Sequence, residues 1–225
     1  MLSLKLKYFY SHLAISALVV ISIGFTCQFL WFPTPFIFID GTWVALFILA
    51  IVDITLGPLL TLLLINARKS KQALLVDMLI IVSLQLTALT YGLIQIEKEQ
   101  VLAIVHYDGA FNLIPKKELK ANELSVIEKL PEYHGIRYAM IVDADLFQHS
   151  KNSTEQLLYS AMMYRRLTKK EILKAVYPYK NLPKKIKDKY NSSYIFKGLA
   201  GKKQDAVLVL TENMKLVDIM LLPQE

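Results

Sequence analysis

A single carboxylate stands in the middle of a long apolar stretch. Asp53 lies within residues 42–65, where nearly every other residue is apolar, and Gly57 and Pro58 follow it. A stretch of this length crosses a hydrocarbon core of about 30 Å as a helix. A central Asp costs ~3 kcal/mol there, but the surrounding Leu, Ile, Val and Phe return more. The segment is therefore expected to span a membrane, and Asp53 is expected to have a specific partner.

Small and polar residues recur at helical spacing in this segment and again in residues 73–96. Such spacing places them on one face of each helix. Asp53 and Gln85 fall at similar depths near the midplane of their helices, so we predict a hydrogen bond between them, with small residues allowing close approach. Pro58 leaves the carbonyl of Ile54 without its helical donor, which predicts a bend. The two stripes are Ala50, Asp53, Gly57 and Thr61, and Asp77, Gln85, Ala88 and Gly92.

The polar midpoint admits three interpretations. The pattern favours helix packing within the bundle. A second interpretation is a docking surface for another transmembrane helix that carries a positive or hydrogen-bonding group, and the third is a proton or ion relay. Asp77, beside Arg68 and Lys71, is expected to pair locally with the basic loop or to extend toward the interface.

Few other residues are arranged for catalysis. Asp143 and Asp145 form a D-x-D after a strand-like run, with His149 nearby, a pair that can hold a divalent metal and a sugar nucleotide. The surrounding region is short and has no nucleotide-binding half, so we expect a solvated turn. His106 and His134 lack metal-ligand spacing. The single cysteine, Cys27, excludes an internal disulfide. We expect neither enzymatic activity, nor a metal, nor a cofactor.

A basic stretch at residues 165–189 is interleaved with tyrosines. It allows three readings: solvated charge near anionic headgroups, contact with an acidic protein partner, or binding of single-stranded nucleic acid, which is the least favoured. Its candidate contact residues are Arg165, Arg166, Lys169, Lys170, Lys184 and Lys185.

The distribution of apolar residues along the chain predicts its domain organisation. Of the 225 residues 54% are hydrophobic, the net charge is +7, and nearly all the long apolar runs precede residue 97. We predict a short N-terminal segment (1–9), three transmembrane helices (about 10–32, 42–65 and 73–96) and a globular domain (97–225). Short basic segments, at Lys5 and Lys7 and at 68–71, are expected to be cytoplasmic. The globular domain would then lie outside the cytoplasm, which in a Gram-negative cell means the periplasm.

The globular domain is predicted to be α+β. Strand-like runs occur at 101–107 and 110–114, with a hairpin signal at Asp108 and Gly109, and again at 136–142, 194–199, 206–210 and 216–222. Helical spacing occurs at 116–130, 153–167 and 168–176. The aromatic and proline residues at 31–36 are expected to form an interfacial exit from the first span.

Four motifs resemble the type IV pilin accessory protein family of the Tfp X/Z type. They are K-Y-F-Y-S-H-L-A-I-S (7–16), W-F-P-T-P-F (31–36), V-D-I-T-L-G-P-L-L-T-L (52–62) and L-Q-L-T-A-L-T-Y-G-L (84–93). The likeness is strongest over residues 1–115. The residues that match the recurring motif positions are Asp53, Gly57, Pro58, Gln85, Tyr91 and Gly92.

The resemblance implies an inner-membrane accessory protein that binds a cognate major pilin and assists pilus assembly or surface display. The three helices would cradle the pilin helix among membrane lipids, and the basic outer domain would contact the pilin head. Two alternatives remain: a membrane-anchored pilin-modifying enzyme and a periplasmic ligand-binding or DNA-binding module. The sequence leaves the oligomeric state open.

Overall fold

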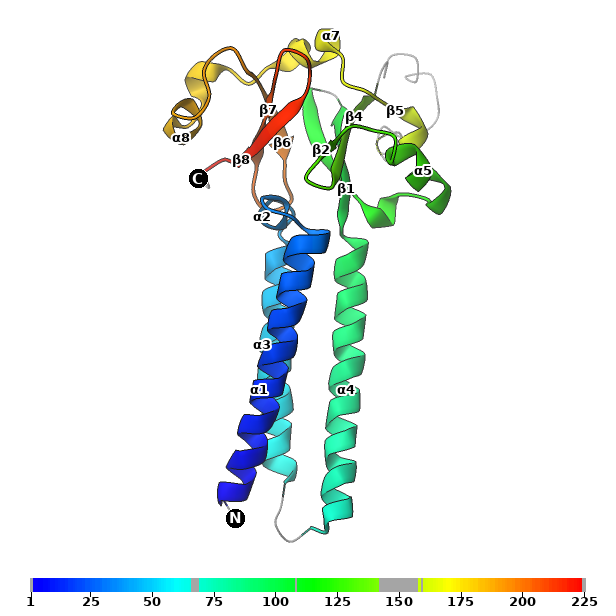
Figure 1. Cartoon of the computed structure of the whole chain (residues 1–225), viewed down its shortest axis with the longest axis vertical. Coiled ribbons are helices and arrows are strands. Elements are labelled where there is room, and N and C mark those ends of the chain that lie inside the picture. The colour runs from blue at the N-terminus through cyan, green and yellow to red at the C-terminus, as the bar shows by residue number, and fades with distance from the viewer. Residues whose placement is uncertain (1, 66–68, 108, 142–157, 159, 224–225) are drawn as a thin grey trace. The chain divides into compact units, whose positions relative to one another are not determined.

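The structure is a computed structural model, and it describes residues 2–65, 69–107, 109–141, 158 and 160–223. The chain forms two compact units (Figure 1). The first unit comprises Met1–Trp31 and Thr42–Glu97, and the second comprises Phe32–Gly41 and Lys98–Glu225. The connection between the first two long helices therefore belongs to the second unit.

The first unit consists of long apolar helices. α1 (Leu2–Thr26) continues as a π-helical segment (Cys27–Trp31), and α3 (Thr42–Leu64) and α4 (Lys71–Lys98) follow. All three are long and apolar enough to cross a membrane, as predicted, although α1 begins eight residues before the expected start at residue 10. α1 and α3 pack side by side (Figure 1). Pro58 lies inside α3.

The second unit is built on a mixed sheet of eight strands, in agreement with the predicted α+β class. The main path runs β3-β4-β1-β2-β6-β7-β8, and β5 pairs with β4. The β1–β4 and β2–β6 pairs are parallel, whereas the other pairs are antiparallel. The strands are β1 (Val101–Tyr107), β2 (Ala110–Pro115), β3 (Glu132–Tyr133), β4 (Ile136–Ile141), β5 (Tyr164–Arg165), β6 (Ile195–Ala200), β7 (Ala206–Leu210) and β8 (Leu216–Leu221).

The six predicted strands are confirmed. The β1–β2 hairpin pairs Tyr107 with Ala110, and Gly109 takes the positive φ of +85° that such a turn favours. Asp108 and Val142 lie outside the described residues. β3 and β5 were not predicted, because two residues are too few to display a period.

One of the three helix predictions is wrong, and a second is wrong over residues 160–167. Residues 116–130 form two 3-10 turns and one short helix, α5 (Leu124–Ile127), because Leu119 and Lys120 are extended and the Glu123 carboxylate bonds the Lys120 N–H at 3.0 Å. Within 153–167, Leu158 is helical, but residues 160–167 contain a 3-10 turn (Ala161–Met163) and then β5, which pairs with β4, so the predicted helix does not reach residue 167. Residues 168–176 are helical in two short pieces, α7 (Lys169–Ile172) and a 3-10 turn (Leu173–Ala175).

Alternating side chains give the sheet two apolar faces. Ile104 and Leu208 point into one cluster, while Ala103 and Val207 point to the opposite side. On that opposite side, Ile127 of α5 packs over β1 and β4, and Ile186 of α8 (Lys184–Lys187) packs over β6 and β7.

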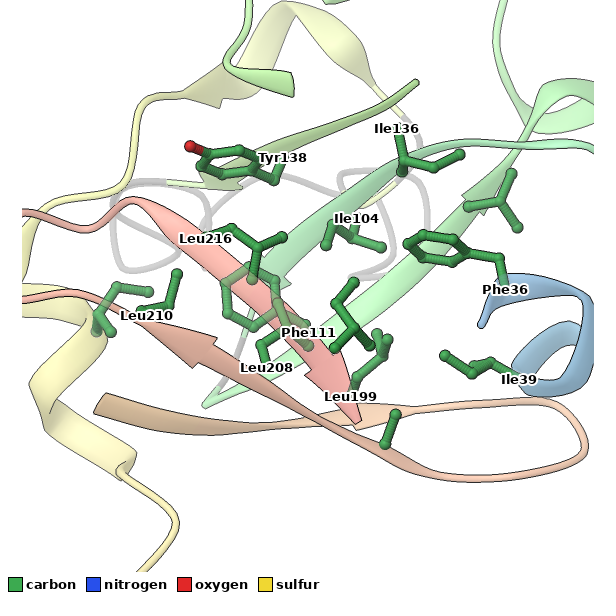
Figure 2. Packing of buried hydrophobic residues seen from close by; sticks show 14 of the residues in the cluster. Phe36, Ile39, Ile104, Phe111, Ile136, Tyr138, Leu199, Leu208, Leu210 and Leu216 are labelled. Carbon is green, nitrogen blue, oxygen red and sulfur yellow. The ribbon is translucent and has the colours of Figure 1, made fainter. Parts of the chain in front are cut away.

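The segment before the second long helix supplies part of the main core. α2 (Phe36–Asp40) places Phe36 and Ile39, both fully buried, against the first apolar face (Figure 2). The Ile39 carbonyl accepts the N–H of Lys203 at 3.1 Å, and Asp40 pairs with Lys202 at 2.9 Å. The prediction that residues 31–36 lie at the membrane interface is therefore wrong for Phe32 and Phe36, whose side chains have no exposed surface.

The two ends of the main strand path are bridged by a side-chain hydrogen bond. Tyr133 of β3 donates to Asp218 of β8 at 3.3 Å. These strands are the first and last in the sheet order, so the sheet must curl strongly to bring them together. The cluster that contains Phe36 lies on a face to which β1, β4, β7 and β8 all contribute (Figure 2).

Candidate helix-docking site in the three-helix unit

Asp53 and Gln85 are hydrogen-bonded, as their matched depths predicted. The Gln85 amide nitrogen donates to the Asp53 carboxylate Oδ1 at 3.3 Å and to its backbone carbonyl at 3.2 Å. Asp53 is 9% exposed. A polar side chain in an apolar bundle is stabilised when a neighbouring helix supplies its partner, and here α4 supplies it to α3.

His12 of α1 extends these hydrogen bonds, and it was not among the residues predicted from the sequence. Its Nε2 lies 2.7 Å from Gln85 Oε1, and its Nδ1 lies 2.6 Å from Thr61 Oγ1. The Thr61 hydroxyl also lies 2.9 Å from the Gly57 carbonyl. His12, Thr61, Gln85 and Asp53, here called the polar network, therefore link all three long helices. The sequence pattern that could have indicated His12 is a third polar stripe, because His12 and Ser16 stand four residues apart in an apolar run. Both side chains are buried in the structure.

Gly57 makes the network possible. A Cβ at this position would lie 2.0 Å from Gln85 Nε2, so any larger residue would displace the amide. Gly92 has a milder version of the same role, because its Cβ would lie 2.8 Å from Leu49 Cδ1. Gly57 therefore leaves room for the Gln85 side chain, and Gly92 leaves room for the Leu49 side chain.

Two cavities flank the network within this unit. The larger, about 400 Å³, lies between α3 and α4 and is mostly apolar. The smaller, about 280 Å³, lies between α1 and α4. Asp53 and Gln85 line both cavities. Side chains of the larger one, here called the α3–α4 groove, include Ala45, Leu49, Val52, Leu56, Ala88 and Gly92.

The other site residues predicted in the helices fall into three groups: buried, lining the α3–α4 groove, and exposed. Pro58 and Thr61 are buried, and Ala88 and Gly92 line the α3–α4 groove. Tyr91 is 66% exposed and does not line either cavity.

Asp77 forms a local ion pair near one end of α4. Its partner is Lys69, at 2.5 Å. The pairing is local, as predicted, although the basic residues expected beside Asp77 were Lys71 and Arg68, of which Arg68 lies outside the described residues.

The basic residues predicted to contact a partner lie in two parts of the chain, residues 165–170 and α8. Arg165 pairs with Met140 on the β4 side of the sheet, and its guanidinium bonds the carbonyls of Met162 and Tyr164. Arg166, Lys169 and Lys170 follow it and are exposed. Lys184 and Lys185 lie on α8, which packs over β6 and β7 through Ile186. Both groups of basic side chains are exposed.

No group of three or more His, Cys, Asp or Glu side chains that could hold a metal ion occurs among the residues that the structure describes. The D-x-D pair Asp143 and Asp145, together with His149, falls outside them. His106 is buried in β1, and burial, together with the nearby Lys197, lowers its pKa to about 4. A histidine that stays neutral in a protein core is consistent with a packing role.

Comparison with known proteins finds relatives for about half of the chain. It is 28% identical to the fimbrial assembly protein of serogroup E1 from Dichelobacter nodosus over 127 residues, which are 56% of this chain and 49% of the relative. The serogroup I protein of that organism matches to the same extent. The protein of serogroups C1 and C2 is 28% identical over 113 residues, 50% of this chain and 86% of the relative.

The chain spans about half the length of the first two of these curated relatives. No protein-family model matches the chain, and no solved structure matches it. The names of the relatives confirm the resemblance to a type IV pilus-related family that the four motifs indicated.

Proposed function

We propose that this chain is an integral inner-membrane accessory protein of type IV pilus biogenesis, and that its three-helix unit binds the transmembrane helix of a cognate major pilin. The relatives named fimbrial assembly proteins support a role in pilus biogenesis. The three long apolar helices support insertion into the membrane. The protein acts by binding, without a catalytic step of its own.

The α3–α4 groove is the observation that carries the pilin-binding proposal. It has a volume of about 400 Å³ and is lined mainly by apolar and small side chains, with a polar point at Asp53 and Gln85 and a further polar side chain, Gln95. Helices associate in membranes through close packing along small residues and through interhelical hydrogen bonds. In this proposal, Ala88 and Gly92 allow the close packing, and the polar point provides the interhelical hydrogen bond.

The second unit is proposed to lie in the periplasm. Lys69 and Lys71, together with Lys5 and Lys7, flank the ends of the apolar helices, and short basic segments of this kind stay in the cytoplasm. A reporter that is active only in the periplasm should work when it is fused after Gln100 and fail when it is fused after Lys71. A cytoplasmic signal after Gln100 would reject contact between this unit and a pilin head.

Filling the groove tests pilin binding. Ala88→Leu adds bulk inside the groove without altering the polar network, so pilin recovered with the tagged full-length protein from membranes should fall several-fold. Thr87→Leu is the matched control, because Thr87 is exposed beside Ala88 and does not line the groove. Equal pilin recovery with both folded variants would exclude the groove as the pilin site.

A further inference from the structure

The hydrogen atoms of the polar network can be assigned from its heavy-atom distances. The Asp53 backbone carbonyl can only accept, so the Gln85 atom facing it must be the amide nitrogen. Gln85 Oε1 therefore faces His12 Nε2 at 2.7 Å, and that nitrogen must carry a proton. Flipping the amide would place two acceptors against each other at Asp53.

The second ring nitrogen of His12 follows from Thr61. The Thr61 hydroxyl has one hydrogen and lies within hydrogen-bond distance of both His12 Nδ1 and the Gly57 carbonyl. Both contacts are hydrogen bonds only when the hydroxyl donates to Gly57 and accepts from Nδ1. His12 then carries protons on both nitrogens, and every bond of the network has one donor and one acceptor.

A doubly protonated histidine needs a counter-charge in this setting. His12 is 8% exposed and Asp53 9% exposed, and an unpaired charge inside an apolar bundle is costly. The titratable side chains that line the two cavities are Tyr8 and His12 from α1 and Asp53 from α3, and α4 contributes no charged side chain to them. Asp53 is thus the negative group available to balance His12, and Gln85 connects the two.

From this geometry we propose that His12 is a buried imidazolium whose charge cancels that of Asp53, and that the α3–α4 groove accepts a transmembrane helix bearing a neutral hydrogen-bond donor at the depth of Asp53. Gln85 occupies Oδ1 of Asp53, and no other described residue donates to the carboxylate. The remaining oxygen therefore needs a donor, while the balanced charges leave nothing for a cationic partner to neutralise. The second part of this inference rests on the proposed function, with the pilin helix as the occupant.

Nitrogen NMR tests the charge state directly. Full-length protein labelled with ¹⁵N-histidine in detergent micelles should show His12 with both ring nitrogens protonated at pH 7, the signal being assigned by its loss in His12→Gln. Asp53→Asn keeps the shape but removes the counter-charge, so it should convert His12 to the neutral form. A neutral His12 in the wild-type protein would overturn the charge assignment.

Synthetic helices test the partner chemistry. Single-span Leu/Ala peptides with Thr, Leu or Lys at the centre would be titrated against the full-length protein in phosphatidylethanolamine–phosphatidylglycerol vesicles, with binding read by energy transfer. The Thr peptide should bind about three- to tenfold tighter than the Leu peptide, and the Lys peptide weakest. In His12→Leu, which leaves Asp53 uncompensated, the Lys peptide should bind best. Equal binding of Thr and Leu peptides to the wild type, or a wild-type preference for Lys, would overturn the inference.

The two proposals fail separately. If the Thr preference holds and pilin is not recovered with the protein, pilin is not the occupant and the proposed function is wrong. If pilin is recovered and depends on the groove, but the Thr preference is absent, only the neutral-donor inference is wrong.

Discussion

Gly57 controls the polar network through its missing side chain. Replacing it with Ala would raise helix propensity by up to about 1 kcal/mol, yet the new Cβ would lie 2.0 Å from Gln85 Nε2 and expel the amide. Gln85 would lose its bonds to both His12 and Asp53. The expected result is a net loss of about 1–2 kcal/mol in the free energy of unfolding, measured by denaturant titration of the full-length protein in micelles.

Gly24 provides the matched control for this change. It lies in α1, and a Cβ there would have no atom within 4 Å. Gly24→Ala should be neutral or slightly stabilising. If Gly57→Ala behaved in the same way, the hydrogen bonds of Gln85 would not contribute to the stability of the bundle.

His106 predicts a pH dependence for the second unit. Burial and Lys197 lower its pKa from 6.5 to about 4, so between these values the unfolded chain binds a proton that the folded chain does not. Stability should therefore fall as the pH is lowered from 6.5 toward 4, by up to about 3 kcal/mol from this group. Unfolding would be followed at pH 7 and pH 5 by tyrosine near-UV circular dichroism.

Two substitutions isolate the His106 contribution. His106→Phe retains a flat ring against Phe111 and should make the stability difference between pH 7 and pH 5 smaller. His134→Gln alters an exposed histidine and should leave the difference unchanged. A wild-type pH dependence in His106→Phe would assign the effect to other groups.

Among single residues, the sequence indicated three of the four members of the polar network, Asp53, Thr61 and Gln85. Asp53 and Gln85 could be paired because both lie near the middle of apolar spans whose antiparallel order matches their depths. His12 was missed, because it stands near the start of the first span and its partners come from two other helices. The His12 contacts are set by how the helices pack, which spacing within one helix does not reveal.

Among the elements, α2 differs most from its predicted role. Its first residue, Phe36, was expected at a membrane interface but lies in the core of the second unit. Phe36 is fully buried in the second unit, so Phe36→Ala should cost about 3–5 kcal/mol. Phe38, in the same short helix, is 42% exposed, and Phe38→Ala should cost far less. Thermal unfolding followed by tyrosine near-UV circular dichroism would compare the two, and similar losses would argue against an anchoring role for Phe36.

The elements also show which patterns the sequence carries reliably. Strands were located well, because side chains such as Ile104 and Val105 alternate between two apolar faces. The helix expected at 116–130 rested on Leu and Ile spacing, and the helix expected at 153–167 rested on apolar spacing with Ser153 as its N-cap. In the structure, a hydrogen bond between Glu123 and the Lys120 N–H interrupts the first of these segments. Pairing of Tyr164–Arg165 with β4 makes the end of the second segment a strand. The role of α2 depends on contacts with strands far along the chain, and an aromatic-proline segment after an apolar run resembles a membrane interface equally well.

On the scale of the second unit as a whole, the bond between its edge strands offers the last prediction. Burial and the neighbouring Asp218 raise the pKa of Tyr133 to about 12, so its hydroxyl remains a donor at neutral pH. Asp218 also accepts from Lys189 and Tyr190, each at 2.7 Å, and these bonds lower its pKa although burial opposes the change. An ionised acceptor and a protonated donor thus meet where β3 approaches β8.

Tyr133→Phe removes this bond and keeps the ring. The loss in unfolding free energy should be about 1 kcal/mol, and amide hydrogen exchange should accelerate in β3 and β8 while the central β1–β2 pair keeps its protection. Tyr194→Phe is the control, because the Tyr194 hydroxyl makes no hydrogen bond with the residues described in this unit. Unchanged exchange at both edges in Tyr133→Phe would mean that core packing around Phe36 and Leu208 alone keeps the sheet curled. Faster exchange confined to β3 and β8 would show that the sheet, although held by one apolar core, depends on a polar bridge to keep its two edges together.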